Sequence, residues 1–191
     1  MILIVNNTLD TPGIMFSKLC EMLCNMRYSY VTLKSNATKQ ETEHIFSNNN
    51  ITGIIFSGGP LCISEWDNLK CDPCVVANAY ILQICKSKPI LAICFGAQFV
   101  AHYFGGRIAR LTEKKENVKT KVYVRRRTEW SGDSSFIVHS FHKDYISKIP
   151  NEAKLVARSK ECVEAFSLRN ILAVQFHPEM SSCGPKLIES M

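Results

Sequence analysis

Three short apolar runs, each followed by a turn and a helical pattern, limit what this chain can fold into more than any other feature. The runs are Met1–Val5, Thr52–Ser57 and Pro89–Ile93. Continuous apolar runs of this length are typical of strands that are covered on both faces of a sheet. Because the strands alternate with helices, the sequence predicts an α/β fold whose open, mostly parallel sheet carries helices on both faces.

Helical patterns lie between and after these runs. Residues 14–23 repeat apolar side chains at the i, i+3 and i+4 spacing of an amphipathic helix. Thr38–Glu41 has a capping-box pattern that begins a polar helix. Pro73–Lys86 predicts an apolar helix opened by proline, and a further helix runs from Cys94 to about Tyr103.

The second half of the chain is predicted to add a small β segment to this sheet. Its β-type stretches are short and separated by turns, and the last of them supplies a final sheet strand. A short helix over Gly184–Met191 closes the chain. We find no repeat or linker, so the sequence predicts one domain over residues 1–191. The predicted β segments are Lys119–Arg127, Phe136–His139, Ala153–Ala157, Val163–Leu168 and Ile171–Phe176.

Composition limits the compartment and the partners. No apolar run approaches the roughly 20 residues of a membrane helix, and the N-terminus lacks the basic segment of a signal peptide. Nine cysteines without an export signal indicate a reducing compartment, so we expect a cytoplasmic protein that binds no membrane. The excess of 23 Lys and Arg over 17 Asp and Glu is too small to predict direct nucleic-acid binding.

Cys71 and Cys74 form an isolated C-x-x-C pair. A zinc site needs two more ligands nearby, and a redox site needs a thioredoxin-like context. Neither is evident in the sequence. We therefore expect no metal and no cofactor.

Cys94 stands where a buried strand turns directly into a helix, in the sequence Ile93-Cys94-Phe95-Gly96. This is the geometry of a nucleophile elbow, which pushes the side chain out of the sheet. The helix N-terminus favours a thiolate, and its backbone N–H groups can stabilise an oxyanion. The alternative is a buried structural cysteine, one of nine in the chain.

Two further strand ends carry candidate site residues. His177 and Glu179 flank a proline after the last strand, and a thiol nucleophile needs an imidazole that a carboxylate orients. The glycines Gly58 and Gly59 follow an earlier strand and let backbone N–H groups approach a ligand closely. Taken singly, a solvated strand end and a tight turn without function would explain these two segments.

Together, the cysteine elbow, the Gly-Gly-Pro turn and the Phe-His-Pro-Glu segment resemble the class I (triad-type) glutamine amidotransferase family over nearly the whole chain. The resemblance implies a flavodoxin-like fold and a catalytic triad of Cys94, His177 and Glu179. It also implies an oxyanion hole formed by the backbone N–H groups of Gly59 and Phe95.

The same resemblance implies where the substrate L-glutamine binds. Gln98, four residues after the nucleophile, matches the family glutamine that contacts the substrate. A loop at Phe141, His142, Lys143 and Asp144 matches the segment that holds the α-amino and α-carboxylate groups. Gly58 completes the implied substrate-binding set.

The sequence most resembles the glutaminase domain or subunit of GMP synthetases, because Ser57–Leu61 lacks the second glycine that other branches carry after proline. No phosphate loop of the S-G-G-x-D-S type is present. We therefore expect a separate ATP-dependent synthetase subunit that receives ammonia from this chain.

Two departures from the family pattern keep alternatives open. Ala92 replaces the usual glycine two residues before the nucleophile, and Lys143 replaces a glycine in the predicted substrate loop. A catalytically weak regulatory or binding protein of the same fold is one alternative. The other is a stand-alone γ-glutamyl hydrolase that has no ammonia acceptor.

Overall fold

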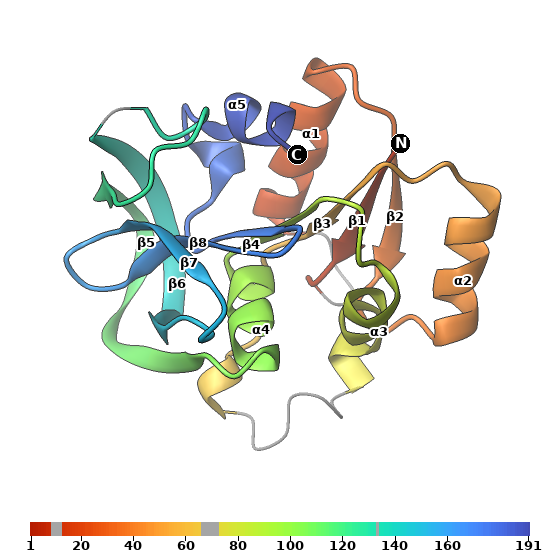
Figure 1. Ribbon diagram of the computed structural model, residues 1–191, viewed down its shortest axis with the longest axis horizontal. Helices are drawn as coiled ribbons and strands as arrows, with labels where there is room; N and C mark the ends of the chain where they lie inside the picture. Colours follow the sequence, from red (N-terminus) through yellow and green to blue (C-terminus); the bar gives the residue numbers. More distant parts are fainter. Residues whose placement is uncertain (9–12, 66–72, 133) are drawn as a thin grey trace.

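A single nine-stranded sheet runs through the molecule in the order β2-β1-β3-β4-β9-β8-β7-β5-β6 (Figure 1). The computed structural model describes residues 1–8, 13–65, 73–132 and 134–191. Neighbouring strands are parallel from β2 to β9 and antiparallel from β9 to β6. The strands are β1 (Ile2–Asn6), β2 (Tyr30–Lys34), β3 (Gly53–Phe56), β4 (Ile90–Ile93), β5 (Arg107–Val124), β6 (Ser135–Lys148), β7 (Lys154–Arg158), β8 (Val163–Leu168) and β9 (Ile171–Val174).

Helices cover both faces of the parallel half, which confirms the predicted α/β class. Apolar side chains of α2, α3 and α4 pack on one face, and those of α1 and α5 pack on the other. The α-helices are α1 (Ile14–Asn25), α2 (Lys39–Asn48), α3 (Val76–Ile84), α4 (Phe95–Tyr103) and α5 (Gly184–Glu189). Short 3-10 turns are η1 (Ile63–Glu65), η3 (Pro73–Val75) and η4 (Pro178–Met180).

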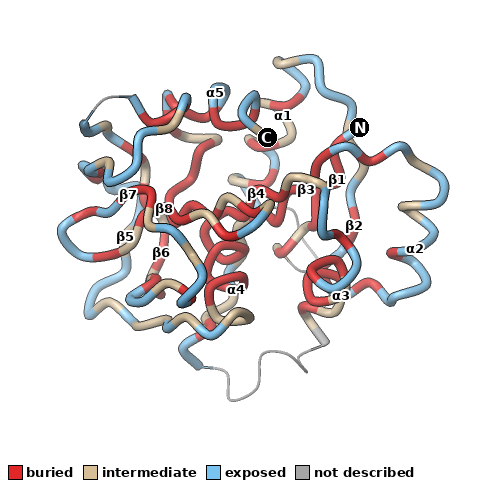
Figure 2. Tube along the Cα trace, viewed as in Figure 1, coloured by how far each residue is buried: buried red, intermediate tan, exposed pale blue. Residues whose placement is uncertain are grey.

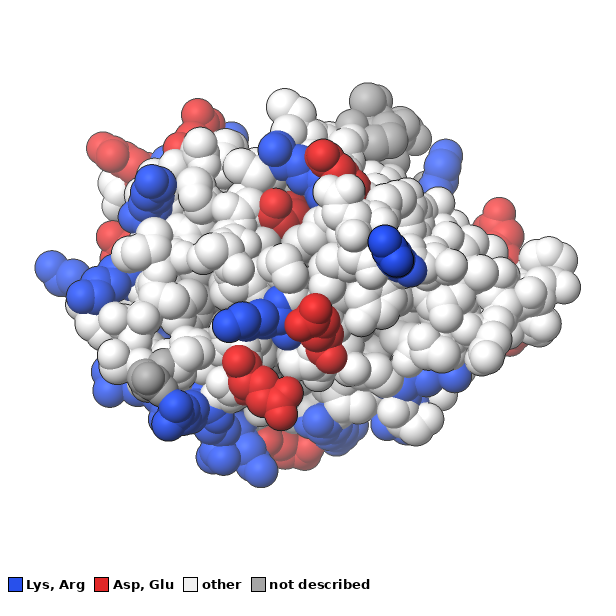
Figure 3. All heavy atoms as spheres, turned by 90° about the horizontal axis from the view of Figure 1, so that it is seen from above, with Lys and Arg blue, Asp and Glu red and all other residues white. Residues whose placement is uncertain are grey.

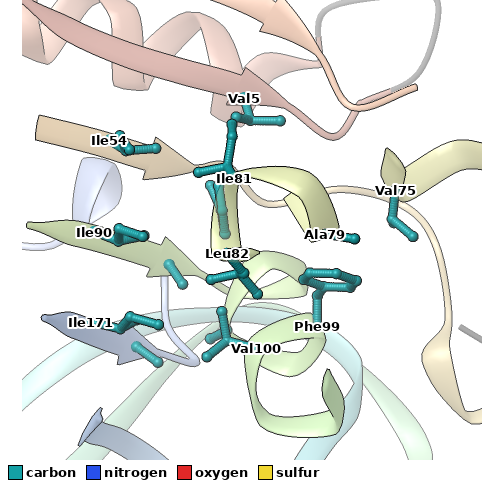
Figure 4. Close-up of a cluster of buried hydrophobic side chains, with 14 of the residues drawn as sticks. Val5, Ile54, Val75, Ala79, Ile81, Leu82, Ile90, Phe99, Val100 and Ile171 are labelled. Carbon is teal, nitrogen blue, oxygen red and sulfur yellow. The ribbon is translucent and has the colours of Figure 1, made fainter. Parts of the chain in front are cut away.

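Alternate residues of the central strands supply the two cores. In β3, Ile54 faces the core under α3 and α4, whereas Ile55 faces α1 and α5. Figure 4 shows Val5, Ile54, Ile90 and Ile171 from four strands in a row beneath the two helices. Burial is accordingly concentrated in the central strands and α4 (Figure 2), which gives the carboxyl ends of these strands a rigid base.

The antiparallel extension is longer than the sequence predicted. β5 and β6 pair over most of their length, whereas only 119–127 and 136–139 were expected as strand. The missed part of β5 is exposed and charged, so no apolar alternation marks it. The missed part of β6 does alternate, but its inward positions are mainly polar residues, among them Ser140, His142 and Asp144.

The helical predictions hold with one shift at a boundary. Thr38 and Glu41 form the expected capping box, in which the Thr38 backbone N–H donates to Glu41 Oε2 at 2.7 Å. The helix expected from residue 73 begins with a 3-10 turn and becomes α-helical at Val76. No helix in the described ranges is both long enough and apolar enough to cross a membrane. Figure 3 shows one face of the molecule, where acidic and basic side chains are spread over a largely uncharged surface.

The packing of β3 gives a prediction for stability. Ile54 is fully buried, whereas Ile137 on β6 is 48% exposed. We expect Ile54→Ala to lower the free energy of unfolding by about 2–5 kcal/mol, because the truncated side chain leaves a cavity. The control Ile137→Ala should change it by less than about 0.5 kcal/mol. Urea denaturation measures both, and equal effects would contradict this description of the core.

Candidate active site

Cys94 lies in a strained turn between β4 and α4. Its φ of 48° is in the left-handed region that non-glycine residues rarely adopt. Neighbouring elements hold the turn, since the Cys94 backbone N–H donates to Val174 O at 2.8 Å and Gln98 N donates to Cys94 O at 2.9 Å. A Cβ atom on Gly96 would lie 2.6 Å from Phe56 O, so only glycine lets α4 approach β3 this closely.

His177 and Glu179 follow β9 and are joined by a short hydrogen bond. Nδ1 of His177 lies 2.6 Å from Glu179 Oε1, and the two side chains are 5% and 2% exposed. The segment is tied to β6 because the His177 backbone N–H donates to His139 O at 3.0 Å. Ser181 Oγ also donates to His177 O at 2.8 Å, which fixes the end of the segment.

The Cys94 thiol and the His177 ring meet over Gly58. A Cβ atom placed on Gly58 would lie 2.9 Å from His177 Cε1 and 3.6 Å from Cys94 Cβ. Burial of the ring opposes its protonation, but the Cys94 sulfur and the Glu179 carboxylate outweigh burial and raise the pKa of His177 well above its ordinary value. The site therefore favours a protonated imidazole beside a thiolate.

A buried polar network holds the Gly-Gly-Pro turn. Asn7 donates from its backbone N–H to Ser57 Oγ at 2.9 Å and from Nδ2 to Ser57 O at 2.8 Å. Asn78 on α3 donates to Asn7 Oδ1 at 3.0 Å. A Cβ atom on Gly59 would lie 2.3 Å from Asn7 O, so this turn packs against the end of β1 without room for a side chain.

A cavity of about 620 Å³ opens beside these elements. Its wall contains Cys94 and His177, and Ile14 at the start of α1 lies at its rim with 74% exposure. Glu179 is buried behind His177, and the Phe95 side chain packs in the core, so neither lines the cavity. The other predicted site residues in the wall are Gly58, Gly59, Gln98, Phe141, His142, Lys143 and Asp144.

The segment at 141–144 is strand and not the predicted loop. It lies inside β6, where extended backbone turns His142 and Asp144 inward. Lys143 is absent from the described non-glycine residues with positive φ, so the position does not need the family's glycine. Ala92, the other departure, is fully buried and pairs with Ala173 on β9, which leaves room for its methyl group.

The carboxylate of Asp144 is engaged by the turn at η1. Its Oδ2 accepts from the Ser64 backbone N–H at 2.8 Å, and its Oδ1 accepts from Ser64 Oγ at 2.7 Å. Gln98 Nε2 donates to the Asp144 backbone oxygen at 2.7 Å, which joins α4 to β6. Asp144 therefore ties three elements of the cavity wall together.

His142 is a buried ring in the cavity wall whose nitrogens have no hydrogen bond of good geometry. Burial chiefly, with the nearby Lys115 ammonium, lowers the pKa of His142 to about 4, and the Asp144 backbone only partly opposes this. The ring is therefore neutral near pH 7.

Sequence reasoning missed several residues of this site. Asn7 and Asn78 carry no motif, and only their burial identifies them. Lys114 and Asn117 enter the cavity wall because β5 departs from regular pairing between residues 110 and 118. Gln175 belongs to the segment before His177, and its Nε2 lies 3.9 Å from Cys94 Sγ.

The cysteine pair at 71 and 74 stays untested, because Cys71 lies outside the described residues. Within the ranges that the structure describes, no group of three or more His, Cys, Asp or Glu side chains is placed to hold a metal ion.

Comparison with known proteins identifies a family. The model of the class I glutamine amidotransferase family matches residues 9–187. One of the two chains of a glutamine-hydrolysing GMP synthase, from Methanocaldococcus jannaschii, is 34% identical over 164 residues, which are 82% of this chain and 80% of that protein. The GMP synthase of Clostridium botulinum is 37% identical over 136 residues, which are 69% of this chain but only 25% of that protein.

Solved structures agree with this assignment. A candidate GMP synthase subunit from Thermoplasma acidophilum superposes with a TM-score of 0.78 at 28% identity, covering 99% of this chain and 90% of that chain. A glutamine amidotransferase from Thermotoga maritima gives a TM-score of 0.69 at 18% identity, covering 94% and 76%, and supports the fold alone.

The ion pair behind the cavity gives a prediction for the imidazole. Glu179→Gln removes the negative charge beside Nδ1, so we expect the pKa of His177 to fall. A pH titration of the ring carbons by NMR measures this shift. The control Glu152→Gln removes a surface carboxylate that pairs with Arg169 and should leave the His177 titration unchanged. An unchanged His177 pKa in Glu179→Gln would show that the carboxylate does not support the charged ring.

Proposed function

This chain belongs to the class I glutamine amidotransferase family, and we propose that it is the glutaminase subunit of a two-chain GMP synthase. It hydrolyses the side-chain amide of L-glutamine and delivers ammonia to a separate ATP-dependent synthetase chain. The observation that carries the proposal is the Cys94 thiol on a strained elbow, in one cavity with a His177 ring that Glu179 holds. We place the reaction in the cytoplasm, where a catalytic thiol stays reduced.

The first step is proton transfer from the Cys94 thiol to His177. Nδ1 of the ring is engaged by Glu179, so Nε2 is the nitrogen that accepts this proton. The elevated pKa of His177 favours the resulting thiolate–imidazolium pair. The thiolate then attacks the side-chain carbonyl carbon of glutamine, and the carbonyl oxygen becomes an oxyanion.

The oxyanion is stabilised at the meeting point of the Gly-Gly-Pro turn and α4. We assign this role to the backbone N–H groups of Gly59 and Phe95, the first residue of the helix. Gly59 is held there by its contact with Asn7, so its N–H is fixed before the substrate binds. A donor that needs no reorganisation is typically worth about 3 kcal/mol in the transition state.

Release of ammonia follows when His177 returns its proton to the departing amide nitrogen. The γ-glutamyl group then remains on Cys94 as a thioester, which water hydrolyses to glutamate with His177 acting as the base. Gln98 and the 141–144 segment of β6 line the cavity where the α-amino and α-carboxylate groups of glutamine bind in this proposal. Gln98 uses its Nε2 inside the protein, and its side-chain oxygen remains to accept from the substrate ammonium.

The partner chain follows from two observations. The chain spans about four fifths of the Methanocaldococcus relative, whose name makes it one part of a GMP synthase, and about a quarter of the single-chain GMP synthase from Clostridium. The cavity opens to the surface beside Ile14, an apolar side chain that is 74% exposed. We propose that the synthetase docks over this rim and encloses the path of the ammonia.

Removal of the nucleophile tests the proposed chemistry. We expect Cys94→Ala and Cys94→Ser to abolish glutamate formation from glutamine, because neither side chain supplies a thiolate. The control is Cys24→Ala at an exposed position of α1, which should retain the parent rate. Coupled glutamate assays in the presence of the synthetase chain measure all three. Glutamate released by Cys94→Ala at the parent rate would refute the proposal.

The docking rim gives a separate prediction. Ile14→Asp places a charge where we expect an apolar contact, so the dissociation constant of the two chains should rise at least about tenfold. The matched control is Ile84→Asp, which changes an exposed isoleucine at the end of α3, away from the cavity. Calorimetry measures both constants. A monomeric chain that is fully active without any partner would contradict the two-chain arrangement.

A further inference from the structure

Gln175 lies between the nucleophile, the predicted substrate residue Gln98 and strand β6. It follows β9 directly, and none of its surface is exposed. Its Nε2 lies 3.9 Å from Cys94 Sγ, and its Oε1 accepts from Gln98 Nε2 at 3.3 Å and from the Ile146 backbone N–H at 3.2 Å. These contacts join three elements of the site through one side chain.

The orientation of this amide follows from its partners. A backbone N–H can only donate, so the atom that faces Ile146 must be the Gln175 oxygen. The Gln98 Nε2 group is also a donor and faces the same oxygen. The amide nitrogen is therefore the atom that faces the sulfur, and a flipped amide would lose both hydrogen bonds.

A second contact of the sulfur has the opposite effect. The Cys94 thiol lies 3.5 Å from the Phe141 backbone oxygen, which accepts from an S–H group and repels a thiolate. The Gln175 N–H group can only donate, and a thiolate accepts hydrogen bonds more strongly than a thiol does. Of these two neighbours, only Gln175 favours the reactive form of Cys94.

We propose that Gln175 stabilises the Cys94 thiolate by donating a hydrogen bond from Nε2, with Gln98 and β6 holding the amide in that orientation. The proposal rests on the function given above, in which Cys94 is the nucleophile. When the thiol ionises, its proton moves to His177 and no other bond changes. Gln175 then donates to the sulfur throughout the attack on the substrate.

The test is the pH dependence of Cys94 alkylation by iodoacetamide, followed by mass spectrometry of the peptide that contains Cys94. Gln175→Met removes the donor at similar size, and Gln175→Glu replaces it with a carboxylate. We expect the midpoint of the Cys94 profile to rise by about one pH unit in Gln175→Met, which is about tenfold slower labelling at pH 7, and further in Gln175→Glu.

Two controls accompany this measurement. Gln83→Glu makes the same chemical change at an exposed position of α3 and should leave the profile unchanged. The exposed Cys24 on α1 gives an internal reference in every sample, because its labelling should not respond to Gln175. The assay needs neither glutamine nor a partner, so its result does not depend on whether the chain is a glutaminase.

A purely structural role for Gln175 would slow labelling at every pH without moving the midpoint, and that result would overturn the proposal. Superimposable profiles for the folded variants would overturn it as well. Thermal melting shows whether the variants fold. If they do not, the side-chain amide of Gln175 is followed by NMR in the unaltered protein, assigned through its contact with the Ile146 amide. Its signal should move with the midpoint of Cys94 labelling, and a signal that does not move would refute the hydrogen bond.

Discussion

The outer edge of β6 is the feature on which the active site depends. β6 ends the sheet order, yet its edge is not left without partners, because it turns back toward the elbow and the end of β9. Backbone groups of this edge bind the residues that we assign to catalysis and support. The contacts are Cys94 Sγ to Phe141 O, Gln98 Nε2 to Asp144 O, His177 N to His139 O, and Ile146 N to Gln175 Oε1. The antiparallel extension therefore fixes the site that the parallel half presents.

Close packing of glycines holds the site from the other side. Gly96 lets α4 approach Phe56, and Gly59 lets its turn approach Asn7. Gly58 leaves the space in which the His177 ring and the Cys94 side chain meet. These contacts explain how the left-handed backbone of Cys94 persists, since its neighbours determine its position more strongly than its own preference does.

The sequence identified those parts of the fold and site that follow simple local rules. The α/β class followed from apolar runs that alternate with helices, and Cys94, His177 and Glu179 drew attention because each follows a strand end. The extent of β6 did not follow, because its inward positions include His142 and Asp144, which break the apolar signal of a strand. Asn7 and Gln175 act through contacts with residues far along the chain, and no local pattern announces such contacts.

The account requires that glutamine be bonded to Cys94 during turnover. Rapid acid quenching of the chain with glutamine and its synthetase partner, followed by mass spectrometry of the digested protein, tests this directly. We expect a γ-glutamyl adduct on the peptide that contains Cys94, appearing before free glutamate reaches its steady rate. Glutamate formation with no adduct at any time, or with an adduct on another cysteine, would contradict the account.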